Sequence, residues 1–272
     1  MTKNNWFTTN INDRTPTNIC DFKITMNPYK FELNDFHLNA MRVAYELTDS
    51  YNKLYIGYSG GLDSEYVLKT FHKQSLPITP IIIDTPYNKF ENEWAFNYCK
   101  EINVKPEVLT FTENEIVDKL KEKTIDRGFY SLLGGLPLIL CDEVNKIGGS
   151  LLTGYGDPFT VIPGHKSYSP VSTKLEFSEW DYYLDAYDSS HPSGFFTYDL
   201  GLLYSLINQI NYSCHAQKAK YKLYQLPERM KMFWKKEFYT IFREMKTKID
   251  VQYNYYIEKS VLSKDLNKYI KS

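Results

Sequence analysis

The sequence predicts an α/β protein built on a doubly wound parallel sheet, with a helical C-terminal part. Strand-like and helix-like segments alternate between about residues 51 and 157, which is typical of successive strand–helix–strand units. One predicted strand, at residues 81–84, begins with three consecutive isoleucines. A β-branched run favours a strand that is covered on both faces, as strands of a parallel sheet are. From about residue 160 the alternation stops and only helical patterns follow.

One helix is predicted before the alternating region and two more in its first half. A helix is expected over residues 34–50, with Asn34 as its N-cap. Its residues at spacings of three and four are Leu38, Met41, Tyr45 and Thr48. A strand at residues 53–58 leads into a glycine turn and a second helix, which carries Val67, Leu68 and Phe71. The strand at residues 81–84 precedes a third helix, whose stripe is Phe90, Trp94, Tyr98 and Ile102.

The second half continues the alternation with a strand at residues 108–111 and a helix at residues 113–123. Pro137 suits the first turn of a further helix, because its missing N–H would have no partner there. We expect that helix to end at Gly148-Gly149, a pair suited to a C-cap, before a strand at residues 151–153. Later helices are expected near residues 198–211, 215–225, 228–248 and 252–270.

Composition narrows the class of protein. Of the 272 residues, 43% are apolar and 24% are charged, as in ordinary globular proteins. No apolar stretch approaches the roughly 18–20 residues of a membrane span, so no membrane association is expected. The four cysteines never form Cys-x-x-Cys, which argues against a zinc ribbon or a disulfide framework. Residues 1–10 are polar and carry no export signal, so we expect a cytoplasmic location.

Positive charge is concentrated at the C-terminal end. Residues 213–272 contain 14 Lys and Arg against 6 Asp and Glu, although the whole chain has a net charge of −1. A segregated basic region has two interpretations: it attracts a polyanion such as a nucleic acid, or it forms the solvated faces of helices.

The predicted chemical site directly follows the strand at residues 53–58. It is formed by the run Ser59, Gly60, Gly61, Leu62, Asp63 and Ser64. Two adjacent glycines after a strand allow a tight turn whose N–H groups point into one concavity, next to the start of a helix. Unpaired amides and the positive end of the helix dipole both favour a phosphate group.

Asp63 is unexpected in a phosphate cradle, because a carboxylate repels phosphate. It is explained if Asp63 holds a Mg²⁺ ion that bridges phosphate oxygens. The chain lacks the Gly-x-x-x-x-Gly-Lys-Ser/Thr pattern of γ-phosphate-cleaving NTPases. It also lacks Gly-x-Gly-x-x-Gly in this turn, which counts against nicotinamide or flavin binding.

The run at residues 59–64 resembles the signature of the PP-loop (N-type) ATP pyrophosphatases, which have an adenine nucleotide α-hydrolase-like fold. Within them the chain is similar to the synthetase domain of asparagine synthetase over roughly residues 35–160. The resemblance implies cleavage of ATP between its α- and β-phosphates, with Mg²⁺. A carbonyl-type oxygen is adenylated, pyrophosphate leaves, and a nitrogen or sulfur nucleophile attacks.

The resemblance also implies roles for residues outside the loop. Asp84 is expected beside the adenosine, with a role as a strand-end helix cap as the alternative. The run at residues 151–157 is similar to the second glycine-rich strand end of these enzymes. It contributes Gly154, Gly156 and Asp157, with Asp157 as a second metal ligand or as a loop cap. Lys222 or Lys166 is expected to stabilise the α-phosphate during transfer.

The chain departs from asparagine synthetase in two ways. It begins Met1-Thr2, without the cysteine that opens the glutaminase domain, so the source of ammonia stays open, with a separate partner as one option. Pro158-Phe159 follows Asp157 where these enzymes carry Asp-Glu, which leaves the product open. We divide the chain into an N-terminal extension with the leading helix (1–50), a PP-loop ATP-binding α/β core (51–160) and a mainly helical C-terminal region (161–272).

Three functions follow from these observations. The first is an AMP-forming ligase or amidotransferase-like enzyme that uses ATP and Mg²⁺ on a small molecule. The second keeps the same half-reaction but modifies a tRNA or DNA base, with the basic C-terminal region as the nucleic-acid contact. The third is a nucleotide-binding module without catalysis. Homo-oligomerisation is compatible with each of them.

Overall fold

A computed structural model describes residues 6–10, 23–26, 35–86, 88–127, 132–155, 190–192, 194–210, 220 and 222–226. Its centre is a parallel sheet in the order β5-β4-β3-β6. The strands are β3 (Leu54–Gly57), β4 (Thr79–Asp84), β5 (Glu107–Thr110) and β6 (Ser150–Leu152). The predicted α/β class with a parallel sheet is therefore confirmed.

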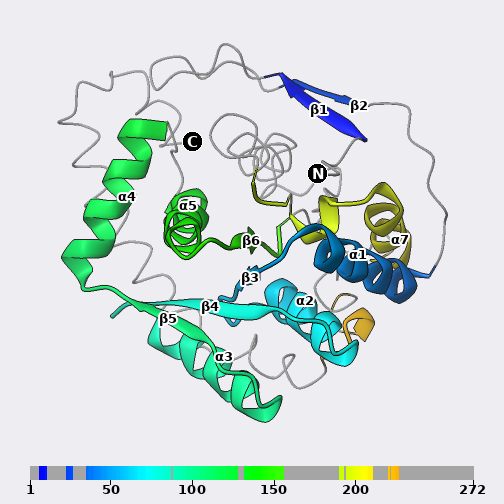
Figure 1. Cartoon of the computed structure of the whole chain (residues 1–272), viewed down its shortest axis with the longest axis horizontal. Helices are drawn as coiled ribbons and strands as arrows, with labels where there is room; N and C mark the ends of the chain where they lie inside the picture. The colour runs from blue at the N-terminus through cyan, green and yellow to red at the C-terminus, as the bar shows by residue number, and fades with distance from the viewer. Residues whose placement is uncertain are drawn as a thin grey trace, which may run out of the picture.

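Helices cover both faces of this sheet (Figure 1). One face packs against α1 (Phe36–Ser50), α2 (Leu62–Lys73), α3 (Lys89–Glu101) and α7 (Leu200–Ile210). The other packs against α4 (Glu113–Arg127) and α5 (Leu132–Lys146). Neighbouring residues of one strand divide between the two cores: Ile82 faces the first, and Ile81 and Ile83 face the second. This two-sided burial explains why the isoleucine run predicted β4 correctly.

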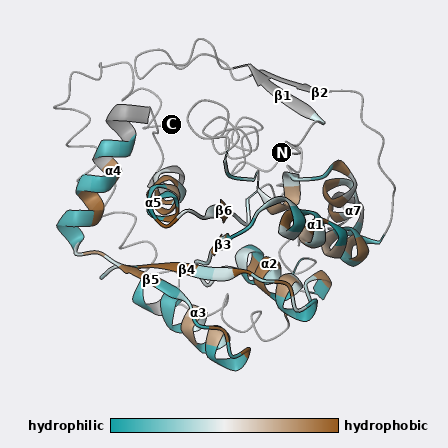
Figure 2. Cartoon of the chain, viewed as in Figure 1, coloured by the Kyte–Doolittle hydropathy of each residue, from teal (hydrophilic) through white to brown (hydrophobic). Residues whose placement is uncertain are grey.

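The distribution of hydrophobic residues matches these layers. Figure 2 shows hydrophobic residues in β4 and α5, at the centre of the molecule, whereas α4 is largely hydrophilic. Ile116, Val117 and Leu120 nevertheless give α4 a buried side against the second core. No helix among the described residues is long and apolar enough to cross a bilayer.

The first helix was predicted correctly in extent, but its N-cap was wrong, and the stripe noted in the sequence is not its buried face. The N-cap is Asp35, whose carboxylate accepts a hydrogen bond from the His37 N–H at 2.8 Å. Leu38 and Tyr45 of the predicted stripe are 57% and 46% exposed. The buried face lies opposite and consists of Phe36, Asn39, Ala40, Val43, Ala44 and Leu47.

The helix that contains Pro137 also differs from its prediction. Pro137 lies inside α5, five residues after its start at Leu132, not in the first turn. The predicted glycine end is confirmed: Gly148 has φ +67°, and the Gly149 N–H bonds to the Val144 carbonyl at 3.0 Å. This left-handed residue allows the chain to leave α5 and enter β6.

The segment before α7 lies along the outer edge of β6. The Leu151 N–H donates to His191 Nδ1 at 2.8 Å, and the Phe195 N–H donates to the Thr153 carbonyl at 2.9 Å. Phe195 begins a short 3₁₀ helix, Phe195–Thr197, that leads into α7. These contacts cover strand-edge groups that would otherwise need water or another chain.

Of the helices predicted after residue 198, one is confirmed, one is partly described and two lie outside the described residues. The helix expected near residues 198–211 is confirmed by α7, and residues 220, 222 and 223 within 215–225 are helical. The helices expected at 228–248 and 252–270 lie outside the described residues. A two-stranded antiparallel sheet of β1 (Phe7–Asn10) and β2 (Lys23–Met26) was not predicted. The three-part division of the chain stays a prediction.

Asp199 anchors α7 and joins it to α1. Its carboxylate accepts the Leu202 N–H at 2.9 Å, as an N-cap does, and forms an ion pair with Arg42 of α1. We expect Asp199→Ala to lower the free energy of unfolding by about 1–2 kcal/mol, because both contacts are lost. Urea denaturation measures this change. An unchanged midpoint and slope would contradict the anchoring role.

Candidate nucleotide-binding site

The predicted site lies where the strand order of the sheet reverses. The chain passes from β3 to β4 and β5 on one side, and β6 then joins β3 on the other side. Because the strands are parallel, the residues that follow β3, β4 and β6 meet at one edge of the sheet. Open α/β sheets bind their ligands at this kind of switch point, outside the carboxyl ends of the strands.

The loop after β3 depends on glycine at residue 60. Gly60 has φ +71°, a left-handed conformation that L side chains rarely adopt. A methyl group on Gly60 would lie 2.4 Å from the Glu91 carbonyl oxygen of α3. Gly61, the N-cap of α2, is exposed and has an extended backbone with φ −77° and ψ 160°. The loop therefore makes a tight turn against α3 and opens directly into the N-terminus of α2.

The loop hydroxyls hold this turn in shape. Ser64 Oγ donates to the Gly61 carbonyl at 3.1 Å, and the Gly61 N–H donates to Ser59 Oγ at 3.3 Å. The two serine oxygens are 3.4 Å apart. The first N–H groups of α2, from Leu62 onward, have no partner within the helix, which makes this end attractive to an anion. Ser59 and Gly61 are exposed and accessible to such a ligand.

Gly154, one of the predicted site residues, brings the chain after β6 against the loop. A methyl group on Gly154 would lie 2.9 Å from Ser64 N and 3.2 Å from the Asp63 carbonyl carbon. The two backbones are thus in contact, and any larger residue would push the second strand end away from α2. Gly156 and Asp157 of the same run, and Lys166, lie outside the described residues.

Asp84 ends β4 on the other side of the loop. Its carboxylate accepts a hydrogen bond from Asn92 Nδ2 at 2.8 Å, and Asn92 Nδ2 also contacts the Ile83 carbonyl at 3.1 Å. The side chain that accepts the Thr85 N–H is Asn88, not Asp84. Asp84 is therefore fixed at the strand end and is partly exposed, which suits a contact with the nucleoside.

Asp63 has two partners that the sequence did not suggest. Its Oδ1 accepts a hydrogen bond from Tyr224 Oη at 3.0 Å and forms an ion pair with Lys220 Nζ at 3.2 Å. The Lys220 side chain is 4% exposed and that of Asp63 is 33% exposed. Burial, followed by the adjacent Asp63 carboxylate, raises the pKa of Tyr224 well above its usual value, so its hydroxyl stays protonated. Lys222, the predicted cation, is exposed.

The residues present fit a bridging Mg²⁺ ion. Mg²⁺ usually keeps several waters and binds through one or two carboxylates together with phosphate oxygens. Both donors to Asp63 contact Oδ1, and Oδ2 has no hydrogen-bond partner among the described residues. Among all the residues that the structure describes, no group of three or more His, Cys, Asp or Glu side chains could hold a metal ion by itself. A metal at Asp63 would therefore need the phosphates of a nucleotide as ligands.

Comparisons with known proteins give similarities only among solved structures. No protein-family model matches the chain, and no curated protein matches it. NMN synthetase from Francisella tularensis is 19% identical, with a TM-score of 0.33, over 44% of this chain and 54% of that one. NH3-dependent NAD synthetase from Campylobacter jejuni is 15% identical, with a TM-score of 0.36, over 80% and 93%.

A third similar structure is the U34-tRNA thiolase NcsA from Methanococcus maripaludis. It is 15% identical, with a TM-score of 0.35, over 79% of each chain. The chain spans about half the length of the NMN synthetase that it matches. Because all three TM-scores are below 0.5, function has to be inferred from the chain's own residues.

Proposed function

We propose that this chain binds ATP with Mg²⁺ at residues 59–64 and uses it to adenylate a carbonyl-type oxygen of a small molecule, releasing pyrophosphate. A nitrogen nucleophile then attacks the activated carbon, as in an AMP-forming ligase or amidotransferase-like enzyme. Ammonia from a separate protein is one source of that nitrogen. The acceptor itself is unassigned.

One observation carries this proposal: the left-handed glycine loop opens onto a helix N-terminus at the switch point of the sheet, with an aspartate in its first turn. The loop supplies N–H donors for phosphate, and Asp63 supplies an oxygen ligand for a cation. The loop run itself, residues 59–64, contains no lysine of the kind that binds the β- and γ-phosphates in Walker NTPases. Cleavage between the α- and β-phosphates is therefore favoured over release of the γ-phosphate.

Each residue of the site has a separate role in binding ATP or in stabilising the charge on its phosphates. In this proposal the N–H groups at the start of α2 bind the pyrophosphate part, and Asp84, held by Asn92 at the end of β4, contacts the adenosine. Bound Mg²⁺ would neutralise negative charge on the phosphates, and Asp63 Oδ2 would hold it. Lys220, buried in its ion pair with Asp63, would stabilise charge on the α-phosphate. Roles for Asp157, Gly156, Lys166 and Lys222 remain predictions.

Exchange of radiolabelled pyrophosphate into ATP tests the adenylation step. If the chain forms an adenylate reversibly, exchange should appear only when the correct acceptor is present. Small carboxylic acids and amides are the acceptors to screen first, alongside total tRNA. Exchange with a small molecule supports the proposal. ATP binding without exchange under every condition would favour the non-catalytic nucleotide-binding module.

The second candidate function, modification of a nucleic acid, is favoured by the basic balance of residues 213–272. If those charges contact phosphates, replacing Lys231, Lys235 and Lys236 together should reduce the slope of log affinity against log salt by about three units. These lysines lie outside the described residues. If the acceptor is small, we expect the triple variant to keep its pyrophosphate exchange within a few-fold. Loss of salt-sensitive tRNA binding would favour the second function.

A further inference from the structure

Tyr224 reaches the loop aspartate from a distant part of the chain. It lies 161 residues after Asp63 and donates its hydroxyl to Asp63 Oδ1 at 3.0 Å. The side chain is fully buried, at 0% exposure. A buried hydroxyl that donates to a partly exposed carboxylate restricts the rotation of that carboxylate, because turning it would break the bond.

Tyr224 is itself held at both ends against α2. Its backbone carbonyl accepts a hydrogen bond from Lys69 Nζ at 3.1 Å, and the next carbonyl, that of Gln225, accepts one from the same nitrogen at 2.7 Å. Lys69 and Asp63 belong to the same helix, so one rigid element fixes both the backbone and the hydroxyl of Tyr224. Gln225 takes a left-handed conformation, with φ +54°, to make this clamp.

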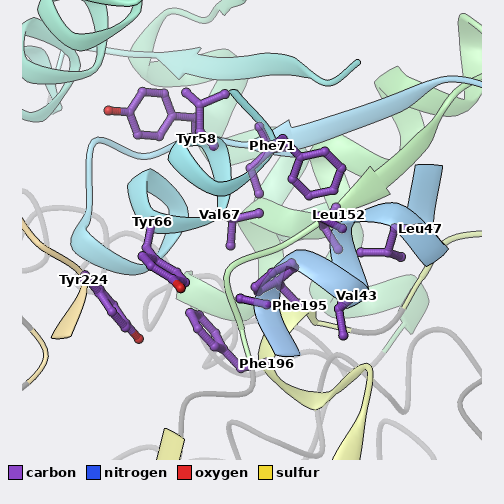
Figure 3. Close-up of a cluster of buried hydrophobic side chains, with 14 of the residues drawn as sticks. Val43, Leu47, Tyr58, Tyr66, Val67, Phe71, Leu152, Phe195, Phe196 and Tyr224 are labelled. Carbon is purple, nitrogen blue, oxygen red and sulfur yellow. The ribbon is translucent and has the colours of Figure 1, made fainter. Parts of the chain in front are cut away.

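Aromatic rings fix the plane of the Tyr224 ring. The Tyr66 ring of α2 stacks on it at 4.3 Å between centroids, with 22° between the planes. Phe36 and Phe196 stack at 5.9 Å each, with planes within 15° and 7°. Figure 3 shows the Tyr66, Tyr224 and Phe196 rings side by side. Stacking on these three rings thus sets the plane of the Tyr224 ring, and among the described residues its hydroxyl bonds to Asp63.

We propose that Tyr224 is a positioning residue for the metal: its hydroxyl holds Asp63 Oδ1 so that Oδ2 points to the nucleotide's Mg²⁺ ion. This inference rests on the proposed function and deepens it. Lys220 approaches the same Oδ1, so two donors bind one oxygen and leave the other for the ion. Residues that orient a metal ligand in this way affect metal affinity without touching the metal.

The test compares two variants that each remove one hydroxyl from the same stack of rings. Tyr224→Phe removes the contact with Asp63, whereas Tyr66→Phe removes a contact with His37 Nδ1 at 3.0 Å. The readout is the Mg²⁺ concentration that half-saturates binding of α,β-methylene-ATP, measured by calorimetry. We expect Tyr224→Phe to raise this concentration about 10-fold and Tyr66→Phe to leave it within about two-fold.

Three outcomes decide the question. The positioning role is supported if the two variants have similar melting temperatures and only Tyr224→Phe raises the half-saturating Mg²⁺ concentration. If Tyr224→Phe has the Mg²⁺ dependence of the unaltered chain, the tyrosine serves packing only and the inference is wrong, although the proposed function stands. If the unaltered chain binds the analogue equally well with and without Mg²⁺, both the inference and the metal part of the proposed function are overturned.

Discussion

Replacing Gly60 with alanine is expected to reduce affinity for ATP by about 10- to 100-fold, which corresponds to about 1.4–2.8 kcal/mol. The reason is local. Gly60 has φ +71°, and a left-handed conformation costs a non-glycine residue about 1–2 kcal/mol. The added methyl group would also lie 2.4 Å from the Glu91 carbonyl oxygen, which is backbone and cannot turn aside. The loop would have to move away from α3 and lose the alignment of its N–H groups.

Gly148→Ala is the matched control. Gly148 has a similar φ of +67°, but a methyl group there would meet nothing within 4 Å. It therefore carries the same conformational cost without the collision, and it lies at the end of α5, away from the loop. We expect it to lower stability slightly and to leave ATP affinity unchanged. Equal losses of affinity in the two variants would mean that the Gly60 loop is not the nucleotide site.

Asp63→Asn is expected to abolish the dependence of nucleotide binding on Mg²⁺ and to remove turnover. An amide keeps the shape of the side chain but binds a divalent cation poorly, because its negative charge is gone. Calorimetric titration of an ATP analogue with and without Mg²⁺ measures the effect directly. A variant that keeps the Mg²⁺ dependence of the unaltered chain would rule out Asp63 as the metal ligand.

The same substitution has a second effect on stability. Asp63 forms an ion pair with the buried ammonium group of Lys220, and the substitution removes this ion pair. We expect Asp63→Asn to lower the free energy of unfolding by about 1–3 kcal/mol. Adding Lys220→Met should restore part of this loss while Mg²⁺-dependent binding stays absent. The double variant thus separates the metal role of Asp63 from its structural role.

Local patterns were sufficient to predict the sheet and the loop. The isoleucine run of β4, the glycine pair after β3 and the glycine end of α5 each reflect a requirement of the residue's own backbone or burial. Glycine at residue 60 allows the left-handed conformation that the turn requires, because it lacks a Cβ atom, and three adjacent β-branched residues favour a strand. These features appeared where the sequence placed them.

Contacts between distant segments could not be predicted in the same way. Both sides of α1 carry apolar residues, and its buried side is chosen by α7, where Asn39 bonds to the Gly201 carbonyl at 3.1 Å. Lys220 and Tyr224 lie 157 and 161 residues from Asp63, and no spacing rule connects them. A lysine two positions from the predicted Lys222 was therefore missed. The excess of lysines over residues 213–272 was the only feature of the sequence that pointed to a cation from this region.

The identity of the nucleotide products tests the central claim most directly. With ATP labelled at the adenine and the γ-phosphate, and with the acceptor found by pyrophosphate exchange, one turnover should yield AMP and pyrophosphate in equal amounts. This result follows from the proposed function, in which the loop would bind the pyrophosphate part at the N-terminus of α2 and present the α-phosphate to the acceptor. ADP and inorganic phosphate as the stoichiometric products would contradict the account.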